Sequence, residues 1–184
     1  MIVTIHQPNF MPWYPYFQKM QQADIFVILE NCQFEKNGFQ NRFNKNNNWY
    51  TMSTTRKLIP INEKPYLNHE KDWLRIKAKL PEYFKILNQF DDCICNNLAN
   101  TNIDIIKKIK NLLKIDTKIV LDYPTEFRST ERLVDICKKN NATTYLSGIS
   151  GKKYLDIDLF KKEKIEVIFQ KEEDMIKKSI LEIL

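Results

Sequence analysis

The chain has 184 residues, of which 43% are hydrophobic and 28% charged. These proportions are typical of a globular protein with a substantial core and exclude a disordered chain, so the simplest expectation is one domain spanning residues 1–184. No run approaches ~18 uncharged apolar residues, so we expect no membrane span. The N-terminus lacks the basic segment and apolar stretch of a secretory signal, which predicts a cytoplasmic protein.

The net charge of +6 does not by itself define a partner. Most lysines fall on expected helices among acidic residues, which is more typical of solvated helix faces than of a nucleic-acid track. An anionic small substrate is equally compatible with a modest positive field. We therefore expect a small-molecule partner and no nucleic acid, while the oligomeric state stays unknown.

Four cysteines occur, at positions 32, 93, 95 and 137, and only two histidines accompany them. The spacing of Cys93 and Cys95 is one residue short of C-x-x-C, and no second pair follows. A zinc site needs about four well-placed ligands. We expect structural or free thiols, no metal and no cofactor, with a catalytic Cys32 as the alternative.

The first 30 residues predict a compact βαβ unit. The β-branched run at 2–5 indicates a strand, Pro15 suits the first turn of a helix, and the apolar run at 25–29 is typical of a buried parallel strand. The two strands then send His6-Gln7 and residues 30–33 toward the same edge of a sheet. Open α/β sheets bind ligands at the carboxyl ends of their strands, so we predict a site there.

Residues 34–48 are polar and rich in amides, and they allow two interpretations. The first is a surface loop with Gly38 in a turn, followed by a hairpin that turns at 46–48 and continues as a strand at 49–54. The second is that Gln40, Asn41 and Arg42 face a substrate, because long loops are often functional and guanidinium groups bind phosphate or carboxylate bidentately.

The rest of the chain alternates between expected helices and strands. We predict short extended pieces over 59–73, a helix over 82–90, a helix capped by Thr101 or Asn102 and running to about 113, and a strand at 119–122. With that strand, a helix over 130–138 capped by Ser129 or Thr130 and a strand at 143–146 give a second βαβ signature. A final strand is expected at 165–169. A short helix at 154–160 and a helical tail at 171–184 complete the elements. The expected fold is α/β, a single three-layer-like domain with a mainly parallel sheet and an antiparallel hairpin insertion around 40–75.

His6 is the natural candidate for acid–base chemistry, because an imidazole exchanges protons near neutral pH. The alternative is a histidine that hydrogen-bonds the loop it begins. Glu30 follows a strand and is a weaker candidate for orienting or deprotonating a group, and Trp13 is a candidate pocket wall. Ser147-Gly148, at the end of a later strand, opens a glycine-containing loop that would let backbone N–H groups approach an anion, although the P-loop spacing is absent.

The sequence resembles the WbqC-like family of bacterial proteins. The resemblance lies in residues 5–9 (Ile-His-Gln-Pro-Asn), 12–13, 16–17 and 23–27, then in 33–34 and 39–42 (Phe-Gln-Asn-Arg), and finally in 145–148 and 154–155. These stretches span nearly the whole chain in the family's order. One departure follows the last expected strand, where Phe169-Gln170 runs directly into residues 171–174 instead of the aromatic, proline-containing segment that is usual in the family.

The resemblance implies a role in O-antigen or other surface-polysaccharide biosynthesis. It suggests a transferase that places glycine or a related acyl group on an amino sugar, free or nucleotide-linked, with His6 as general base. The resemblance implies substrate contacts from Gln7, Asn9, Gln33, Asn41 and Arg42. Together with the candidates argued from the residues themselves, the expected substrate contacts are Gln7, Asn9, Trp13, Glu30, Gln33, Gln40, Asn41, Arg42, Ser147 and Gly148. The alternatives are an ATP-using enzyme that transfers nucleotidyl or adenylyl groups, and a non-catalytic module that binds sugar nucleotides.

Overall fold

A computed structural model describes all residues, 1–184. The chain divides into two compact units that alternate along the sequence, and each is described by itself. Unit 1 consists of residues 1–6, 15–29 and 115–176, and unit 2 of residues 7–14, 30–114 and 177–184. The expectation of a single domain stays a prediction.

Unit 1 is built on a five-stranded sheet in the order β5-β2-β1-β6-β7. The strands are β1 (Ile2–His6), β2 (Ile25–Ile28), β5 (Lys118–Leu121), β6 (Thr144–Ser147) and β7 (Glu166–Phe169). Every neighbouring pair is parallel, which confirms the α/β fold and the parallel sheet that the sequence predicts. Numbered by appearance along the chain, the order is 3-2-1-4-5, the order of a doubly wound sheet.

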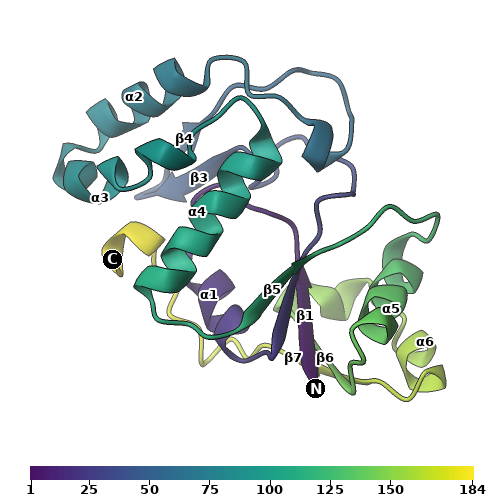
Figure 1. The fold of residues 1–184 in the computed structure, drawn as a ribbon. Helices are drawn as coiled ribbons and strands as arrows, with labels where there is room; N and C mark the ends of the chain where they lie inside the picture. The colour runs from purple at the N-terminus through teal and green to yellow at the C-terminus, as the bar shows by residue number, and fades with distance from the viewer. The chain divides into compact units, whose positions relative to one another are not determined.

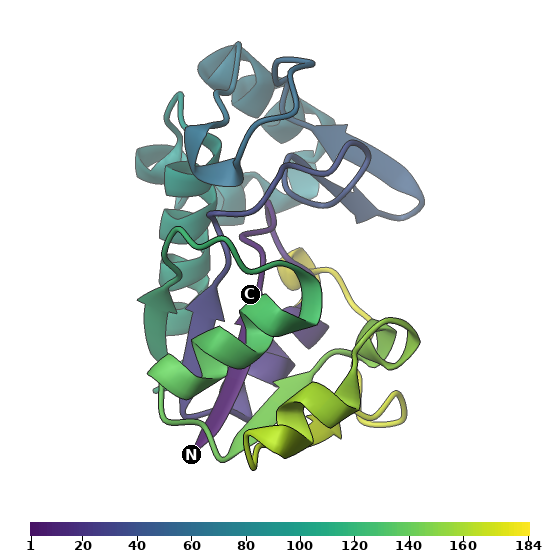
Figure 2. The same ribbon diagram turned by 90° about the vertical axis from the view of Figure 1, so that its right-hand side faces the viewer.

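Helices cover both faces of this sheet. Helix α1 (Tyr14–Gln21) lies on one face, whereas α5 (Ser129–Lys139) and α6 (Ile157–Lys162) lie on the other (Figures 1 and 2). Successive side chains of β1 point to opposite faces of the sheet. Val3 and Ile5 belong to one core cluster with Val134 and Phe160 of the two later helices. Thr4 points the other way and donates from its hydroxyl to the Leu146 carbonyl at 2.7 Å. Val3 and Ile5 therefore pack on the face that α5 and α6 cover, and Thr4 lies on the opposite face.

Unit 2 contains an antiparallel hairpin and three helices. The hairpin pairs β3 (Arg42–Lys45) with β4 (Asn48–Thr51), as the sequence predicts, and the helices are α2 (His69–Lys79), α3 (Phe84–Asn88) and α4 (Leu98–Leu112). Phe10 is the hub of the apolar packing. Its ring lies 5.8 Å from that of Phe43, 6.3 Å from that of Tyr66 and 6.2 Å from that of Trp73 (centroid distances).

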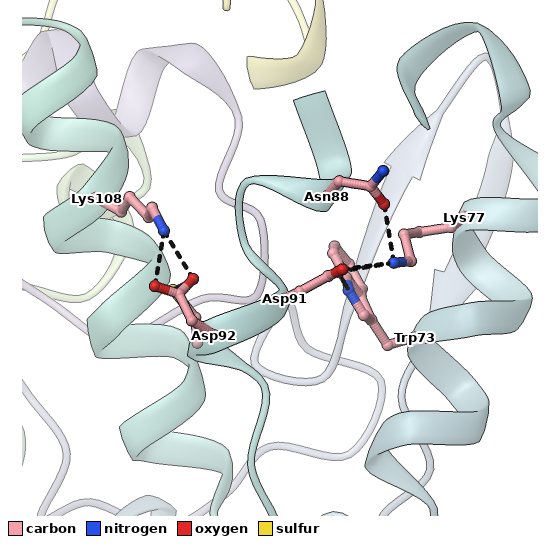
Figure 3. A network of polar contacts seen from close by, with 7 residues as sticks. Trp73, Lys77, Asn88, Asp91, Asp92 and Lys108 are labelled. Atoms are coloured by element: carbon pink, nitrogen blue, oxygen red, sulfur yellow. Dashed lines mark hydrogen bonds and ion pairs between the residues drawn. The ribbon is translucent and has the colours of Figure 1, made fainter. Parts of the chain in front are cut away.

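A polar network ties the turn at residues 91–93 to the helices on either side of it. Asp91 accepts hydrogen bonds from Trp73 Nε1 at 2.7 Å and from Lys77 Nζ at 2.8 Å, and both donors lie on α2 (Figure 3). The neighbouring Asp92 accepts from Lys108 Nζ of α4 at 2.7 Å. Two consecutive carboxylates thus link α2 and α4, which are separated in the sequence by residues 80–97.

Two predicted elements are wrong. Residues 69–79 form helix α2, whereas we expected extended pieces as far as 73. Trp73, Ile76 and Leu80 are buried at helical spacing, but the charged residues between them obscure that pattern in the sequence. The tail at 171–184 is not the expected helix, since only a 3₁₀ turn at Ile180–Glu182 forms. Backbone groups of the tail bond to the Gln18 side chain of α1 instead: its Nε2 donates to the Asp174 carbonyl at 3.0 Å, and its Oε1 accepts from the Ile176 N–H at 2.8 Å.

Other boundaries shift by a few residues. Helix α4 begins at Leu98 with Asn97 as its cap, whose Oδ1 accepts from the Asn100 N–H at 2.9 Å, so Thr101 and Asn102 lie inside the helix instead of capping it. Helix α5 begins at Ser129 after Arg128 and has no side-chain cap. The short helix expected at 154–160 is observed as α6, which begins at residue 157.

Candidate functional site

The direction of sheet winding reverses at β1. From β1 the chain moves outward to β2 and β5, then returns to the opposite side of β1 for β6 and β7. His6 is the last residue of β1 and Ser147 the last residue of the adjacent β6. In open α/β sheets, ligands bind outside the carboxyl ends of the strands at such a switch point. The fold therefore brings two of the predicted site residues to the location in unit 1 where ligand binding is expected.

His6 is half-buried and packed against an aromatic side chain. Its ring stands edge-on to that of Tyr16 on α1, with 4.7 Å between centroids. Its backbone carbonyl accepts from the Leu29 N–H at 2.8 Å, which ties the end of β1 to β2. Burial raises the pKa of Tyr16 well above its ordinary value, so this phenol stays neutral beside the imidazole.

Ser147 is 1% exposed, and its packing explains why a glycine is required at position 151. The Ser147 hydroxyl donates to the Gly148 carbonyl at 3.1 Å. A Cβ on Gly151 would lie 2.1 Å from Ser147 Oγ, so only glycine lets the turn approach the serine this closely. A Cβ on Gly148 would meet nothing within 4 Å, and no glycine of the chain has a positive φ. Gly151 thus has a packing role, whereas Gly148 borders open space.

In unit 2, Gln7 and Gln40 meet. Gln40 Nε2 donates to Gln7 Oε1 at 2.5 Å. Gln7 Nε2 in turn donates to Glu35 Oε1 at 3.2 Å and contacts Cys32 Sγ at 3.4 Å. The residue that follows His6 is therefore the centre of a chain of amide, carboxylate and thiol groups contributed by residues 32–40.

Sequence reasoning missed Asn102, the residue that anchors this cluster from α4. Asn102 is fully buried, and its Nδ2 donates to the carbonyls of Pro8 at 2.7 Å and Gln40 at 2.6 Å. Its Oδ1 accepts from the Tyr66 hydroxyl at 3.1 Å. The available signal is an amide on the buried stripe of α4, in register with Leu98 and Ile106.

Arg42 and Asn41 make contacts within their own loop and hairpin. Arg42 Nε donates to the Gly38 carbonyl at 3.1 Å, Nη2 donates to the Asn37 carbonyl, and the guanidinium lies 4.0 Å over the Trp49 ring. Asn41 Nδ2 donates to the Met52 carbonyl at 2.8 Å. These contacts hold the 37–42 loop against the hairpin.

The remaining predicted residues of unit 2 have different surroundings. Asn9 is buried, Trp13 is exposed, and Gln33 is exposed where it forms an isolated antiparallel bridge with Pro60. The Glu30 carbonyl accepts from the Asn62 N–H at 3.1 Å. Within unit 2 the structure thus joins Gln7 to Gln40 directly and attaches the 30–33 segment to residues 60–62.

A second residue that the sequence did not reveal is Lys19 of α1. It is 3% exposed, and its Nζ donates to the Ile5 carbonyl at 3.2 Å, one residue before His6. Its amine also lies 6.0 Å from the centroid of the Phe26 ring. Burial lowers the pKa of Lys19 from 10.5 to about 7. The available signal is its position on the buried face of α1, three residues after Tyr16.

No three His, Cys, Asp or Glu side chains gather so that they could hold a metal ion. None of the cysteines forms a disulfide. Burial raises the pKa of the Cys93 thiol to about 11 and that of the Cys137 thiol to about 12, so both stay protonated near neutral pH. No helix is long and apolar enough to cross a membrane.

Strand order and the polar groups at the ends of β1 and β6 define a doubly wound α/β protein with a candidate ligand site at its switch point. The chain belongs to the WbqC-like protein family, which matches residues 7–177. It is also similar to a mycobacterial protein, Uncharacterized protein Rv1507c of Mycobacterium tuberculosis, with 26% identity over 192 residues, covering 90% of this chain and 80% of that protein. No solved structure matches.

Proposed function

We propose that this WbqC-like protein is a transferase of surface-polysaccharide (O-antigen) biosynthesis that places glycine or a related acyl group on an amino sugar, free or nucleotide-linked. The observation that carries the proposal is the position of His6, at the carboxyl end of the central strand where the direction of winding reverses. Membership of the family supports the biological setting.

The chemistry assigned to His6 is that of a general base. The amine of the sugar attacks the carbonyl carbon of an activated glycine, a C–N bond forms, and the bond to the leaving group breaks. The nitrogen loses its proton to the imidazole, which passes it to the leaving group. General bases of this kind contribute about 10²–10⁴-fold to the rate.

Substrate binding is assigned to the polar groups that follow His6 and to those at the end of β6. Neutral amides suit sugar hydroxyls and the oxyanion of the tetrahedral intermediate. The proposed contacts are Gln7, Asn9, Trp13, Glu30, Gln33, Gln40, Asn41, Arg42, Ser147 and Gly148. Support for Gln7 and Gln40 comes from their mutual hydrogen bond, which fixes the orientation of both amide groups before a substrate binds.

The strand order favours one further candidate, an ATP-using enzyme that transfers nucleotidyl or adenylyl groups. An order of 3-2-1-4-5 is shared with nucleotide-binding doubly wound sheets, although the likeness is one of architecture alone. Release of pyrophosphate that requires both ATP and magnesium would support this candidate over the acyltransferase.

The test is incubation of the full chain with a nucleotide-linked amino sugar and activated glycine, followed by mass spectrometry of the sugar. We expect the mass of one added glycyl group, and a loss of about 100-fold or more in rate for His6→Gln. His69→Ala is the matched control, because His69 is the other histidine and begins α2. Transfer that is equally fast in His6→Gln would refute the general base, and no acylated sugar with any of several donors would refute the transferase.

A further inference from the structure

The outer face of the β3–β4 hairpin carries side chains that the core does not use. Asn44 pairs with Trp49 across the hairpin and Phe43 with Tyr50, and directly opposed residues share one face of an antiparallel pair. Phe43 is buried and stacks on Tyr50 with centroids 5.1 Å apart, which marks the inner face. Asn44 and Trp49 are exposed and mark the outer face, on which Arg42 also lies.

Two aromatic rings form a surface platform on this outer face. Phe39 and Trp49 are 53% and 45% exposed, and their centroids lie 5.6 Å apart at an interplanar angle of 46°. We call this pair the aromatic platform. The Arg42 guanidinium lies over the Trp49 ring and is itself held by the Gly38 carbonyl, so the tryptophan is kept in place before any ligand arrives.

Neutral amides accompany the platform on the hairpin. Asn44 shares the outer face with Trp49, Asn46 and Asn47 form the exposed turn, and no acidic residue occurs between positions 36 and 51. Each carboxamide offers two donors and an acceptor without a charge. Apolar ring faces bordered by neutral hydrogen-bonding groups match the two sides of a sugar ring, its C–H faces and its hydroxyl rim.

The two cations of the hairpin argue against a nucleic-acid backbone as the occupant. Lys45 is 5% exposed and forms an ion pair with Glu182 at 3.1 Å, and Arg42 donates to backbone carbonyls of its own loop. Non-specific binding of nucleic acid depends on lysine and arginine side chains that can neutralise successive phosphates. The hairpin therefore presents aromatic and amide groups without the accessible positive charge that a phosphate track requires.

We infer that the aromatic platform of Phe39 and Trp49 is a sugar-binding subsite, on which a pyranose ring stacks while Asn44 and the asparagines of the turn hydrogen-bond its hydroxyls. This inference rests on the proposed function, because it names a subsite for the sugar of that reaction. It adds two residues, Phe39 and Trp49, to which no role in binding had been assigned.

The experiment measures sugar binding by saturation-transfer NMR, which requires no catalysis. The probes are a trimer of N-acetylglucosamine, a nucleotide-linked amino sugar and a neutral hexose trisaccharide, each added to the full chain. We expect saturation of the ring C–H protons of at least one probe, and affinity at least about tenfold weaker for the double variant Phe39→Ala/Trp49→Ala. Phe127→Ala is the matched control, because Phe127 is also a phenylalanine about half exposed (49%) but belongs to unit 1.

Conservative variants keep the test decisive if the double variant fails to fold. Phe39→Tyr and Trp49→Phe preserve an aromatic face and should retain most of the affinity, whereas the single Phe39→Ala should lose part of it. Equal affinity in Phe39→Ala and wild type, or no saturable binding of any probe, overturns the inference. Platform-dependent binding of oligothymidylate in preference to all the sugars also overturns it.

The results separate this inference from the proposed function. Sugar binding that depends on the platform, without any glycyl transfer, upholds the subsite and refutes the transferase. Glycyl transfer with an unchanged KM for the sugar in Phe39→Ala/Trp49→Ala upholds the transferase and refutes the subsite.

Discussion

Lys19 offers the sharpest test of the energetics of unit 1, because its amine is buried and no carboxylate pairs with it. Its one hydrogen bond goes to the Ile5 carbonyl. Replacement by methionine keeps the length of the side chain and removes the charge. We therefore expect Lys19→Met to stabilise the protein near neutral pH, against the usual effect of changing a buried residue.

The magnitude follows from the lowered pKa. Burial lowers the pKa of Lys19 from 10.5 to about 7. At about 1.4 kcal/mol per pKa unit, burial of Lys19 lowers the free energy of unfolding by about 5 kcal/mol where the amine is fully protonated in both states. At pH 7 the same cost is about 4 kcal/mol. Loss of the hydrogen bond offsets about 1 kcal/mol of the gain. The net expectation is that Lys19→Met is more stable by about 3 kcal/mol at pH 7.

The sign of the pH dependence is specific to a buried base. Between pH 7 and 10.5 the unfolded chain binds more protons at Lys19 than the folded chain does, so this residue makes the free energy of unfolding rise with pH. The wild type should therefore gain about 2 kcal/mol relative to Lys19→Met between pH 7 and 9. The two proteins should approach each other in stability as the pH rises toward 10.5.

Urea unfolding followed by circular dichroism at pH 7, 8 and 9 measures both proteins. Lys107→Met, which removes an exposed lysine on α4, is the control and should change stability by less than about 0.5 kcal/mol at every pH. A Lys19→Met protein that is less stable than wild type, or a difference that stays constant from pH 7 to 9, would refute the reasoning.

Three further predictions concern packing and polar contacts. Gly151→Ala should destabilise the protein by about 1–3 kcal/mol, because its Cβ would lie 2.1 Å from Ser147 Oγ; adding Ser147→Ala should recover part of that loss in urea titrations, and an unchanged midpoint for Gly151→Ala would contradict the argument. Asn102→Ala should cost about 3 kcal/mol, since it leaves two buried carbonyls without their donor, and a cost below about 1 kcal/mol by the same measurement would show that they find other partners. Burial raises the pKa of the Asp91 carboxyl, but hydrogen bonds from Lys77 and Trp73 outweigh that effect and hold the pKa below 3.8. The stability that this carboxylate contributes is therefore present above about pH 4 and is lost as the pH falls further. Asp91→Asn should destabilise the protein more at about pH 6 than at about pH 3, and equal losses at both pH values would be incompatible with this account.

Much of unit 1 could be predicted from local patterns. The runs at 2–5 and 25–29 are apolar and β-branched, and they form adjacent parallel strands. The hairpin turn at 46–48 was also predictable, because a run of asparagines precedes the strand-forming stretch at 49–54. The structure turns at Asn46 and Asn47, both with positive φ. Such features depend on neighbours a few residues apart, which the sequence displays directly.

Helix α2 and the tail mark where these patterns fail. Charged residues dominate α2, so only its packing against the rest of unit 2 distinguishes it from an irregular segment. In the tail, the spacing of apolar residues suits a helix, yet Lys45 pairs with Glu182 and the Ser179 capping box shapes the last turn. Tertiary contacts overrode the local preference in both segments.

The sequence by itself determined that His6 ends a buried strand, that amides and an arginine follow, and that the chain is related to the WbqC-like family. Only the tertiary structure decided that β1 is the central strand, that Asn102 anchors Pro8 and Gln40, and that Lys19 is buried beneath the end of β1. The physical reason is that strand formation follows from local hydrophobic periodicity, whereas a buried polar group is satisfied by a partner that lies tens of residues away in the sequence.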